Sequence, residues 1–337
     1  MSHNHPYGDG RPVAGHGLSY APGVRALLVV NPQATATSAA GRDVLAHALA
    51  SDVRLEIVET SYRGHAADAA ARAVTEGFDL VVAHGGDGTV NEVVNGLLTQ
   101  CSISGVPDPV DAPALGVVPG GSANVFARAL GLPRDPMEAT HRLLVAIESG
   151  SRRQVGLGLV EPDGADGRWF TFNAGLGWDA DVVAEVERRR DKTASPLLYA
   201  SIALANYVKQ MLTATELLVE LPDGTRERTR LAFVSNTDPW TYLGGKPIHM
   251  NPDCSFDGGL GLFALRSLAP PTIARTLSQI LLPLGPPSGG NLLRLDDVAE
   301  VRVTAERPVR LQVDGDDLGQ HRQVKFTSVP KALRVAV

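Results

Sequence analysis

The sequence predicts an α/β fold in two parts, a doubly wound parallel sheet followed by an antiparallel β-sandwich. Three observations lead to this prediction. Before residue 150, apolar runs typical of strands alternate with helical patterns, as in parallel sheets. Two of these strands end in glycine-rich turns that lead directly into a helix. After residue 150, short β-rich runs follow one another across Pro, Gly and Asp turns, which favours antiparallel pairing.

Length and composition favour a globular protein that works in a reducing compartment. The chain has 337 residues, of which 44% are apolar and 20% charged, so two domains are expected. Residues 1–22 are rich in His, Gly and Pro, which predicts a disordered tail. Cys101 and Cys254 are too few for a disulfide framework. No apolar run approaches the roughly 20 residues of a membrane span. We therefore expect a cytoplasmic protein.

The net charge of −6 argues against nucleic acid as a partner and against general attraction to anionic lipid. Any contact with a membrane must then be local. A basic cluster at Arg188, Arg189, Arg190 and Lys192 is one candidate, and a solvated helix end explains it equally well.

The first elements follow in regular order. Residues 25–30 form a continuous apolar run, as expected of a strand covered on both faces, and the run ends at Asn31 and Pro32. A helix over 42–50 and a strand over 53–60 come next. The alanines of the following helix, 66–75, form a stripe of small residues that permits close packing on a sheet.

The first glycine turn follows the apolar run 80–83. Glycines 85, 86 and 88 surround Asp87, and the next helix carries its apolar residues on one face. Such glycines let a ligand approach bare backbone at a helix N-terminus, which suits a phosphate. The chain has no G-x-x-x-x-G-K-[ST] run, and Asn91 occupies the third glycine position of a dinucleotide fingerprint. An ordinary strand-to-helix turn remains the alternative.

The second glycine turn repeats this pattern. Strand residues 115–118 lead through Pro119, Gly120, Gly121 and Ser122 into another helix. Two such turns can meet at the carboxyl edge of one parallel sheet. A helix over 136–148 completes this part. The β-rich runs and helices expected after it are 155–160, 169–172, 216–221, 229–234, 261–265, 298–304 and 309–313, with helices over 179–212 and 271–282.

The motifs GGDGTVNEVVNG and PGGSANVFARAL resemble the diacylglycerol kinase catalytic-domain family, which includes sphingosine and ceramide kinases. The resemblance implies an ATP-binding domain over 23–150 that the final residues, 320–337, complete. It implies a β-rich lipid-acceptor domain over 151–319. It further implies peripheral contact with the inner face of the membrane, and a homodimer.

The resemblance also implies which residues contact the nucleotide. These are Asn31, Thr35, Thr60, Gly85, Gly86, Asp87, Gly88, Thr89, Asn91, Glu92, Gly120, Gly121, Ser122 and Asn124. Two positions depart from the family pattern. Ser122 replaces the usual threonine and keeps its hydroxyl, whereas Val125 replaces a common aspartate.

Phosphoryl transfer needs bound donor phosphates, neutralised charge and a base for the acceptor hydroxyl. By resemblance, Mg²⁺ is bound by the carboxylate of Asp257 and the carbonyls of Cys254 and Gly259, although a plain β-turn also explains this segment. Asp316 matches the glutamate that is the family's proposed proton acceptor but is one methylene shorter, so Asp87 is its rival. Asp179 is a candidate for binding the lipid head group, or a helix N-cap.

The sequence thus predicts an ATP- and Mg²⁺-dependent kinase of a membrane lipid, with diacylglycerol as the first expected acceptor. Sphingoid bases, ceramide or another lipid alcohol remain alternatives. An NAD-kinase-like phosphotransferase with a soluble acceptor, or an inactive nucleotide- or lipid-binding module, also stays open.

Overall fold

The amino-terminal half contains a parallel four-stranded sheet. The computed structural model describes residues 23–99, 112–177, 215–243, 245–282 and 285–337. The strands run parallel in the order β4, β3, β1, β2, so β1 lies between β2 and β3. Their bounds are β1 Arg25–Val30, β2 Arg54–Glu59, β3 Leu80–Gly85 and β4 Ala114–Pro119.

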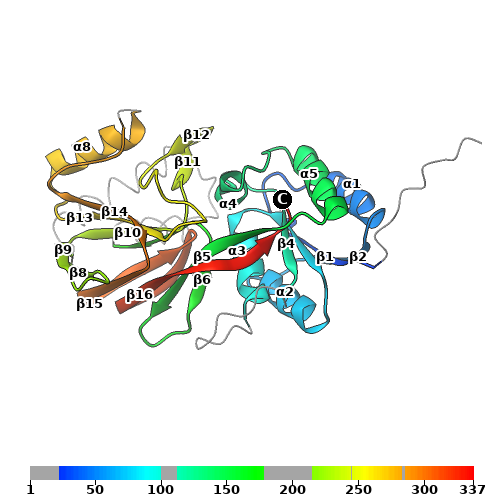
Figure 1. The fold of residues 1–337 in the computed structure, drawn as a ribbon, viewed down its shortest axis with the longest axis horizontal. Helices are drawn as coiled ribbons and strands as arrows, with labels where there is room; N and C mark the ends of the chain where they lie inside the picture. The colour runs from blue at the N-terminus through cyan, green and yellow to red at the C-terminus, as the bar shows by residue number, and fades with distance from the viewer. Residues whose placement is uncertain (1–22, 100–111, 178–214, 244, 283–284) are drawn as a thin grey trace, which may run out of the picture.

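Helices cover both faces of this sheet, which confirms the doubly wound arrangement. On β1, Leu28 points to the face covered by α1 and α5, while Leu27 and Val29 point to the face covered by α2 and α3. The same division is visible in Figure 1. Because successive side chains of a strand alternate between faces, a strand buried on both faces must be apolar throughout. The helices are α1 Ala39–Ala50, α2 His65–Thr75, α3 Asp87–Leu97, α4 Val125–Ala129 and α5 Pro136–Ser149.

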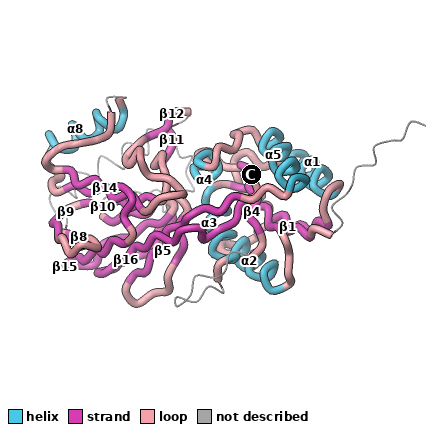
Figure 2. The backbone as a smooth tube through the Cα atoms, in the orientation of Figure 1, coloured by secondary structure: helices cyan, strands magenta, loops and turns pink. Residues whose placement is uncertain are grey.

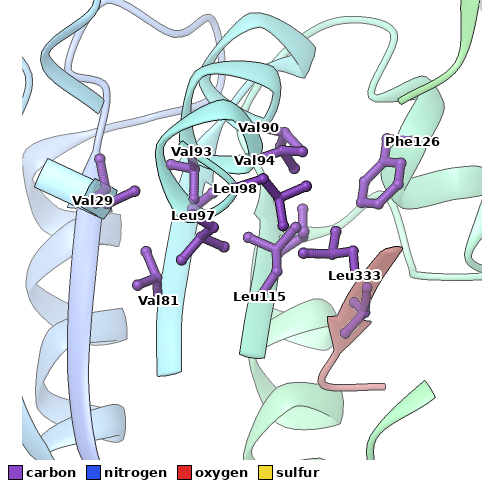
Figure 3. Close-up of a cluster of buried hydrophobic side chains, with 14 of the residues drawn as sticks. Val29, Val81, Val90, Val93, Val94, Leu97, Leu98, Leu115, Phe126 and Leu333 are labelled. Atoms are coloured by element: carbon purple, nitrogen blue, oxygen red, sulfur yellow. The ribbon is translucent and has the colours of Figure 1, made fainter. Parts of the chain in front are cut away.

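One core cluster holds α3 on the sheet and joins the carboxyl terminus to it. Figure 3 shows Val90, Val94 and Leu97 of α3 beside Leu115 of β4, with Leu333 from the last strand in the same cluster. Helices α2 and α3 pack closely through small residues. A Cβ on Gly96 would lie 2.2 Å from the carbonyl oxygen of Ala67. This packing explains the alanine stripe of α2.

The carboxyl-terminal half is rich in antiparallel strands, coloured magenta in Figure 2. The main path runs β14, β13, β10, β7, β15, β16, and its apolar residues form a second core. Among the described residues of this half there is one helix, α8 (Pro270–Leu281). It covers a smaller apolar cluster around Phe233 and Phe263. The strands are β5 Arg153–Pro162, β6 Arg168–Phe170, β7 Asn173–Leu176, β8 Leu217–Glu220, β9 Arg226–Thr229, β10 Leu231–Ser235, β11 Thr241–Leu243, β12 Lys246–Ile248, β13 Leu260–Leu265, β14 Leu292–Val298, β15 Glu300–Val313 and β16 Asp316–Val335.

Two long strands connect the halves. β16 pairs antiparallel with β5 and ends beside β4, where Val335 is opposite Leu115 and the backbone N–H of Ala336 donates to the Leu115 carbonyl at 2.8 Å. The parallel and antiparallel strands therefore belong to one mixed sheet. The domain boundaries at 150 and 320 stay predictions.

Some elements differ from the expectation. The two strands expected at 298–304 and 309–313 are one strand, β15, whose pairing with β16 shifts register between Thr304 and Val309. β14 was not expected at all, because its half-buried sequence includes charged Arg294, Asp296 and Asp297. The helix expected over 179–212 lies outside the described residues.

Candidate active site

A cavity of about 710 Å³ lies at the carboxyl edge of the parallel sheet. Both glycine turns reach it, as predicted from their positions after β3 and β4. It is lined mostly by polar groups, and Asp316 of the carboxyl-terminal half contributes to its wall. The predicted site residues that line it are Asn31, Thr35, Thr60, Gly86, Asp87, Gly88, Thr89, Glu92, Gly121, Ser122 and Asp316.

The two glycine turns pack backbone against backbone. The N–H of Gly120 donates to the Gly85 carbonyl at 2.7 Å. A Cβ on Gly121 would lie 2.6 Å from the Cα of Gly86, so a side chain there would force the turns apart. By contrast, a Cβ on Gly88 would meet nothing within 4 Å. Gly88 is therefore free of packing constraints and borders the open cavity.

Two asparagines shape these turns. Asn124 has a φ of 49°, and its side-chain Oδ1 accepts from the N–H of Gly121 at 2.9 Å while Nδ2 donates to the Gly121 carbonyl at 2.7 Å. Asn31 donates from Nδ2 to Thr89 Oγ1 at 3.1 Å. Of the predicted nucleotide residues, Gly85, Asn91, Gly120 and Asn124 do not line the cavity. In this structure Gly120 and Asn124 fix the shape of the second turn.

Glu92 joins α3 to α2. Its two carboxylate oxygens accept from the backbone N–H groups of Gly64 at 3.0 Å and Ala66 at 3.2 Å. Gly64 is the N-cap of α2 and has no side chain, so Glu92 satisfies N–H groups that a capping side chain would otherwise bind. The carboxylate borders the cavity, but each of its oxygens already accepts a hydrogen bond from a backbone N–H at the start of α2.

Asp87 is the first residue of α3 and lies in the cavity wall. Its Oδ1 accepts from the backbone N–H of Phe126 at 3.2 Å, which joins the two glycine-turn segments. Burial, assisted by the nearby Asp314 carboxylate and opposed by backbone donors, raises the pKa of Asp87 to about 6. A carboxylate with a pKa close to neutral is suited to accept a proton.

Asp314 is buried between the two halves and was missed by the sequence analysis. It sits in the turn between β15 and β16 with a φ of 47°. Thr171 donates to it from both its backbone N–H and its hydroxyl, each at 2.7 Å, and the N–H groups of Phe172 and Asn173 donate at 3.1 and 3.0 Å. Burial raises the pKa of this carboxyl despite these donors. The sequence feature that could have identified Asp314 is its position two residues before the candidate base Asp316.

Asp316 is held by two guanidinium groups. Arg168 donates to it at 2.6 Å, and Arg63 approaches its other oxygen at 3.1 Å. Arg168 also donates to Asn91 Oδ1 at 2.7 Å. The two arginines, which the sequence analysis did not single out, compete with any acceptor hydroxyl for the oxygens of Asp316.

The predicted magnesium ligands do not line the cavity. The exposed carboxylate of Asp257 pairs with Arg153 at 2.8 Å. The carbonyl of Cys254 accepts from the Asp238 N–H at 3.2 Å, and the carbonyl of Gly259 accepts from the Cys254 thiol at 3.9 Å. In the described part of the chain, no three His, Cys, Asp or Glu side chains form a cluster that could hold a metal. The predicted set has one carboxylate and two main-chain carbonyls, and in this structure that carboxylate is paired with Arg153.

The acceptor candidate Asp179 and the basic cluster over 188–192 lie outside the described residues. Within those residues, none of the helices has the length and apolar character needed to cross a membrane.

The fold and the cavity define a class: a two-part α/β protein in which facing glycine turns at a sheet edge border a cavity with carboxylates. Comparisons with known proteins agree. Residues 25–159 match the model of the diacylglycerol kinase catalytic domain. The diacylglycerol kinase of Bacillus subtilis (strain 168) is 31% identical over 267 residues, covering 76% of this chain and 77% of that protein. A "Probable lipid kinase YegS-like" protein of Chromohalobacter salexigens is 32% identical, covering 79% and 78%.

Solved structures share the fold. A diacylglycerol kinase crystal structure from Bacillus anthracis str. Sterne superposes with a TM-score of 0.66 at 20% identity, covering 93% of this chain and 96% of that one. An NAD kinase from Archaeoglobus fulgidus, crystallised with ATP, gives a TM-score of 0.50 at 12% identity, and covers 93% of both chains. The chain belongs to the diacylglycerol kinase catalytic-domain family and is, by that membership, a lipid kinase.

Proposed function

We propose that this lipid kinase transfers the γ-phosphate of ATP to the hydroxyl of diacylglycerol, giving phosphatidic acid and ADP. The observation that carries the proposal is Asp87, a half-buried carboxylate with a raised pKa in the wall of the polar cavity. The names of the relatives support diacylglycerol as the acceptor.

The donor phosphates would bind at the facing glycine turns. Gly86, Gly88 and Gly121 border the cavity with bare backbone, and α3 begins there with its N-terminal N–H groups. Such N–H groups and the positive end of the helix dipole favour a phosphate. The Ser122 hydroxyl and the side chain of Arg63 add further donors in the same wall.

In the transfer step, the acceptor oxygen attacks the γ-phosphorus and the bond from that phosphorus to the bridging oxygen of ADP breaks. The hydroxyl proton passes to Asp87. We assign this role to Asp87 rather than Asp316, because Arg168 and Arg63 already engage both oxygens of Asp316. Asp316 would instead hold these guanidinium groups beside the phosphates, where positive charge stabilises the transferring group.

Dependence on Mg²⁺ remains part of the proposal. A magnesium ion bound with the nucleotide would supply neutralising charge to the phosphates. None of the proposed steps of phosphoryl transfer depends on the segment around Asp257. Chelation of Mg²⁺ should abolish transfer, and Asp257→Asn should retain it. Loss of transfer in Asp257→Asn, in a variant that still folds, would assign the metal role to that residue.

The experiment that tests the function is transfer of labelled γ-phosphate from ATP to a panel of lipid alcohols in mixed micelles. Diacylglycerol, sphingosine and ceramide are compared with NAD as a soluble acceptor. We expect label in phosphatidic acid. Label only in a sphingoid lipid or in NADP would replace the proposed acceptor, and no labelled product while ATP still binds would contradict the proposal.

A further inference from the structure

Helix α8 carries an apolar face that none of the described residues covers. Its residues Ile273 and Thr276 are buried against the cluster around Phe233 and Phe263. On the same helix Leu277 and Leu281 are 44% and 41% exposed, and the following residue, Leu282, is 51% exposed. These three are among only eight large apolar side chains that are exposed in the described part of the chain. Figure 1 places α8 at the opposite end of the molecule from α1 and α5.

Two basic residues lie near this face, and the sequence around α8 contains no acidic residue. Residues 258–295 contain no Asp or Glu, although the whole chain has 37 of them. Arg275 on α8 and Lys246 on β12 are both exposed. Lys246 donates from Nζ to the carbonyl of Leu281 at 2.5 Å, so the hairpin of β11 and β12 reaches the end of α8. Among the described residues neither cation has a carboxylate partner.

A groove of about 390 Å³ lies between the hairpin and the end of α8. Its walls are mainly apolar, with Ile280, Leu281 and Leu282 on one side and Pro247 on the other. Lys246 also borders it. Leu281, Leu282 and Lys246 therefore border one groove, and Leu277 and Arg275 are exposed on the same helix beside it.

We propose that α8 and Lys246 form the surface by which this protein docks on an anionic lipid bilayer. The inference rests on the proposed function, because a kinase of diacylglycerol must reach a substrate that resides in a membrane. A protein with a net charge of −6 is repelled by an anionic surface in general, so contact requires a local region that is free of acidic groups. The leucines enter the interface between headgroups and acyl chains, and the cations meet anionic headgroups.

Charge also decides between a bilayer and a second copy of the chain. In a symmetric dimer the same patch meets itself, which would bring Arg275 and Lys246 of both copies together without carboxylates between them. A bilayer containing phosphatidylglycerol supplies the opposite charge instead.

The test is co-sedimentation of the full chain with vesicles of phosphatidylcholine alone or mixed with phosphatidylglycerol. Wild type should bind the mixed vesicles, and salt should weaken this binding. The double variant Lys246→Gln, Arg275→Gln should bind them about thirtyfold more weakly, from the contribution of each basic residue near an anionic surface. The double variant Leu277→Glu, Leu281→Glu should lose binding at all salt concentrations tested.

The matched control is Val44→Glu, Val145→Glu. These valines are 47% and 50% exposed on α1 and α5, at the far end of the molecule from α8. The two substitutions add the same negative charge as those in the leucine variant. The control should bind as wild type does. Equal losses in the control and the leucine variant would overturn the proposal, as would unchanged binding in the leucine and cation variants. A dimer that the leucine variant dissociates, without any effect on vesicles, would assign the surface to a second copy.

A second readout separates docking from catalysis. Short-chain diacylglycerol, dispersed below its micelle concentration, should be phosphorylated equally by wild type and by the cation variant. If wild type binds mixed vesicles but phosphorylates no diacylglycerol, the proposed acceptor fails and the docking surface stands. If short-chain substrate is phosphorylated but vesicles are not bound, the docking surface fails alone.

Discussion

The side-chain amide of Asn91 donates to Asp314 at 2.8 Å, across 223 positions of sequence. It joins helix α3, which begins at the first glycine turn, to the turn between β15 and β16. The same side chain accepts from Arg168, which in turn binds Asp316. Through these contacts the carboxyl-terminal half holds the cavity wall in one position relative to the glycine turns. The site is thus built across both halves.

This contact should be needed for stability. In Asn91→Ala, the buried Asp314 carboxylate loses a donor and Arg168 loses an acceptor, so the free energy of unfolding should fall by about 2–3 kcal/mol. Chemical denaturation measures this. The Asn291 side chain donates an exposed hydrogen bond to Thr272, and Asn291→Ala should change stability by less than about 0.5 kcal/mol. Equal effects of the two substitutions would contradict the structural role of Asn91.

The pH dependence of transfer should report Asp87. A base with a pKa of about 6 is protonated and inactive below that value, so kcat/KM should rise through pH 6 and level off above it. The pH profile of kcat/KM with short-chain diacylglycerol measures this. A profile already flat between pH 5 and pH 8 would contradict the assignment.

Asp87→Asn should make the protein more stable at pH 8 while removing activity. Burial raises the pKa of Asp87 in the folded state above its unfolded value. The folded state therefore binds the extra proton, and stability falls as pH rises from the unfolded pKa through about 6. Replacing the carboxylate by an amide removes this destabilisation, so the free energy of unfolding at pH 8 should rise by about 1–3 kcal/mol. Thermal unfolding at pH 4 and pH 8 measures it, and the gain should be absent at pH 4.

The two cavity glycines should respond differently to alanine. Gly121→Ala places a methyl group 2.6 Å from the Cα of Gly86 and should destabilise the fold by at least about 2 kcal/mol. Gly88→Ala lies in the first turn of α3 with open space around its Cβ, so stability should rise by about 0.5–1 kcal/mol. Its methyl group would nevertheless obstruct the cavity and raise KM for ATP. Unchanged ATP kinetics in Gly88→Ala would contradict phosphate binding at this turn.

Much of the parallel-sheet half could be predicted because its signals are local. The alternation of apolar strands and helices, and each glycine turn, can be seen within short stretches of sequence. The roles of Asp314 and Arg168 could not, because each depends on partners far away in the sequence: Arg168 contacts Asn91 and Asp316, and Asp314 contacts Asn91 and residues of the segment after β6. The continuous strand β15 was also missed, since exposed Glu306, Arg307 and Pro308 interrupt its apolar pattern.

In the proposed reaction Asp87 accepts the proton of the lipid hydroxyl, while Asp316 positions Arg63 and Arg168. The most direct test measures labelled phosphate transfer to diacylglycerol by wild type, Asp87→Asn and Asp316→Asn, with ATP affinity measured in parallel. We expect Asp87→Asn to lower kcat by about 10²–10⁴ with little change in ATP affinity. Asp316→Asn should lower kcat less and should act mainly by raising the KM for ATP. A loss of kcat in Asp316→Asn as large as that in Asp87→Asn, with ATP binding intact, would contradict these roles.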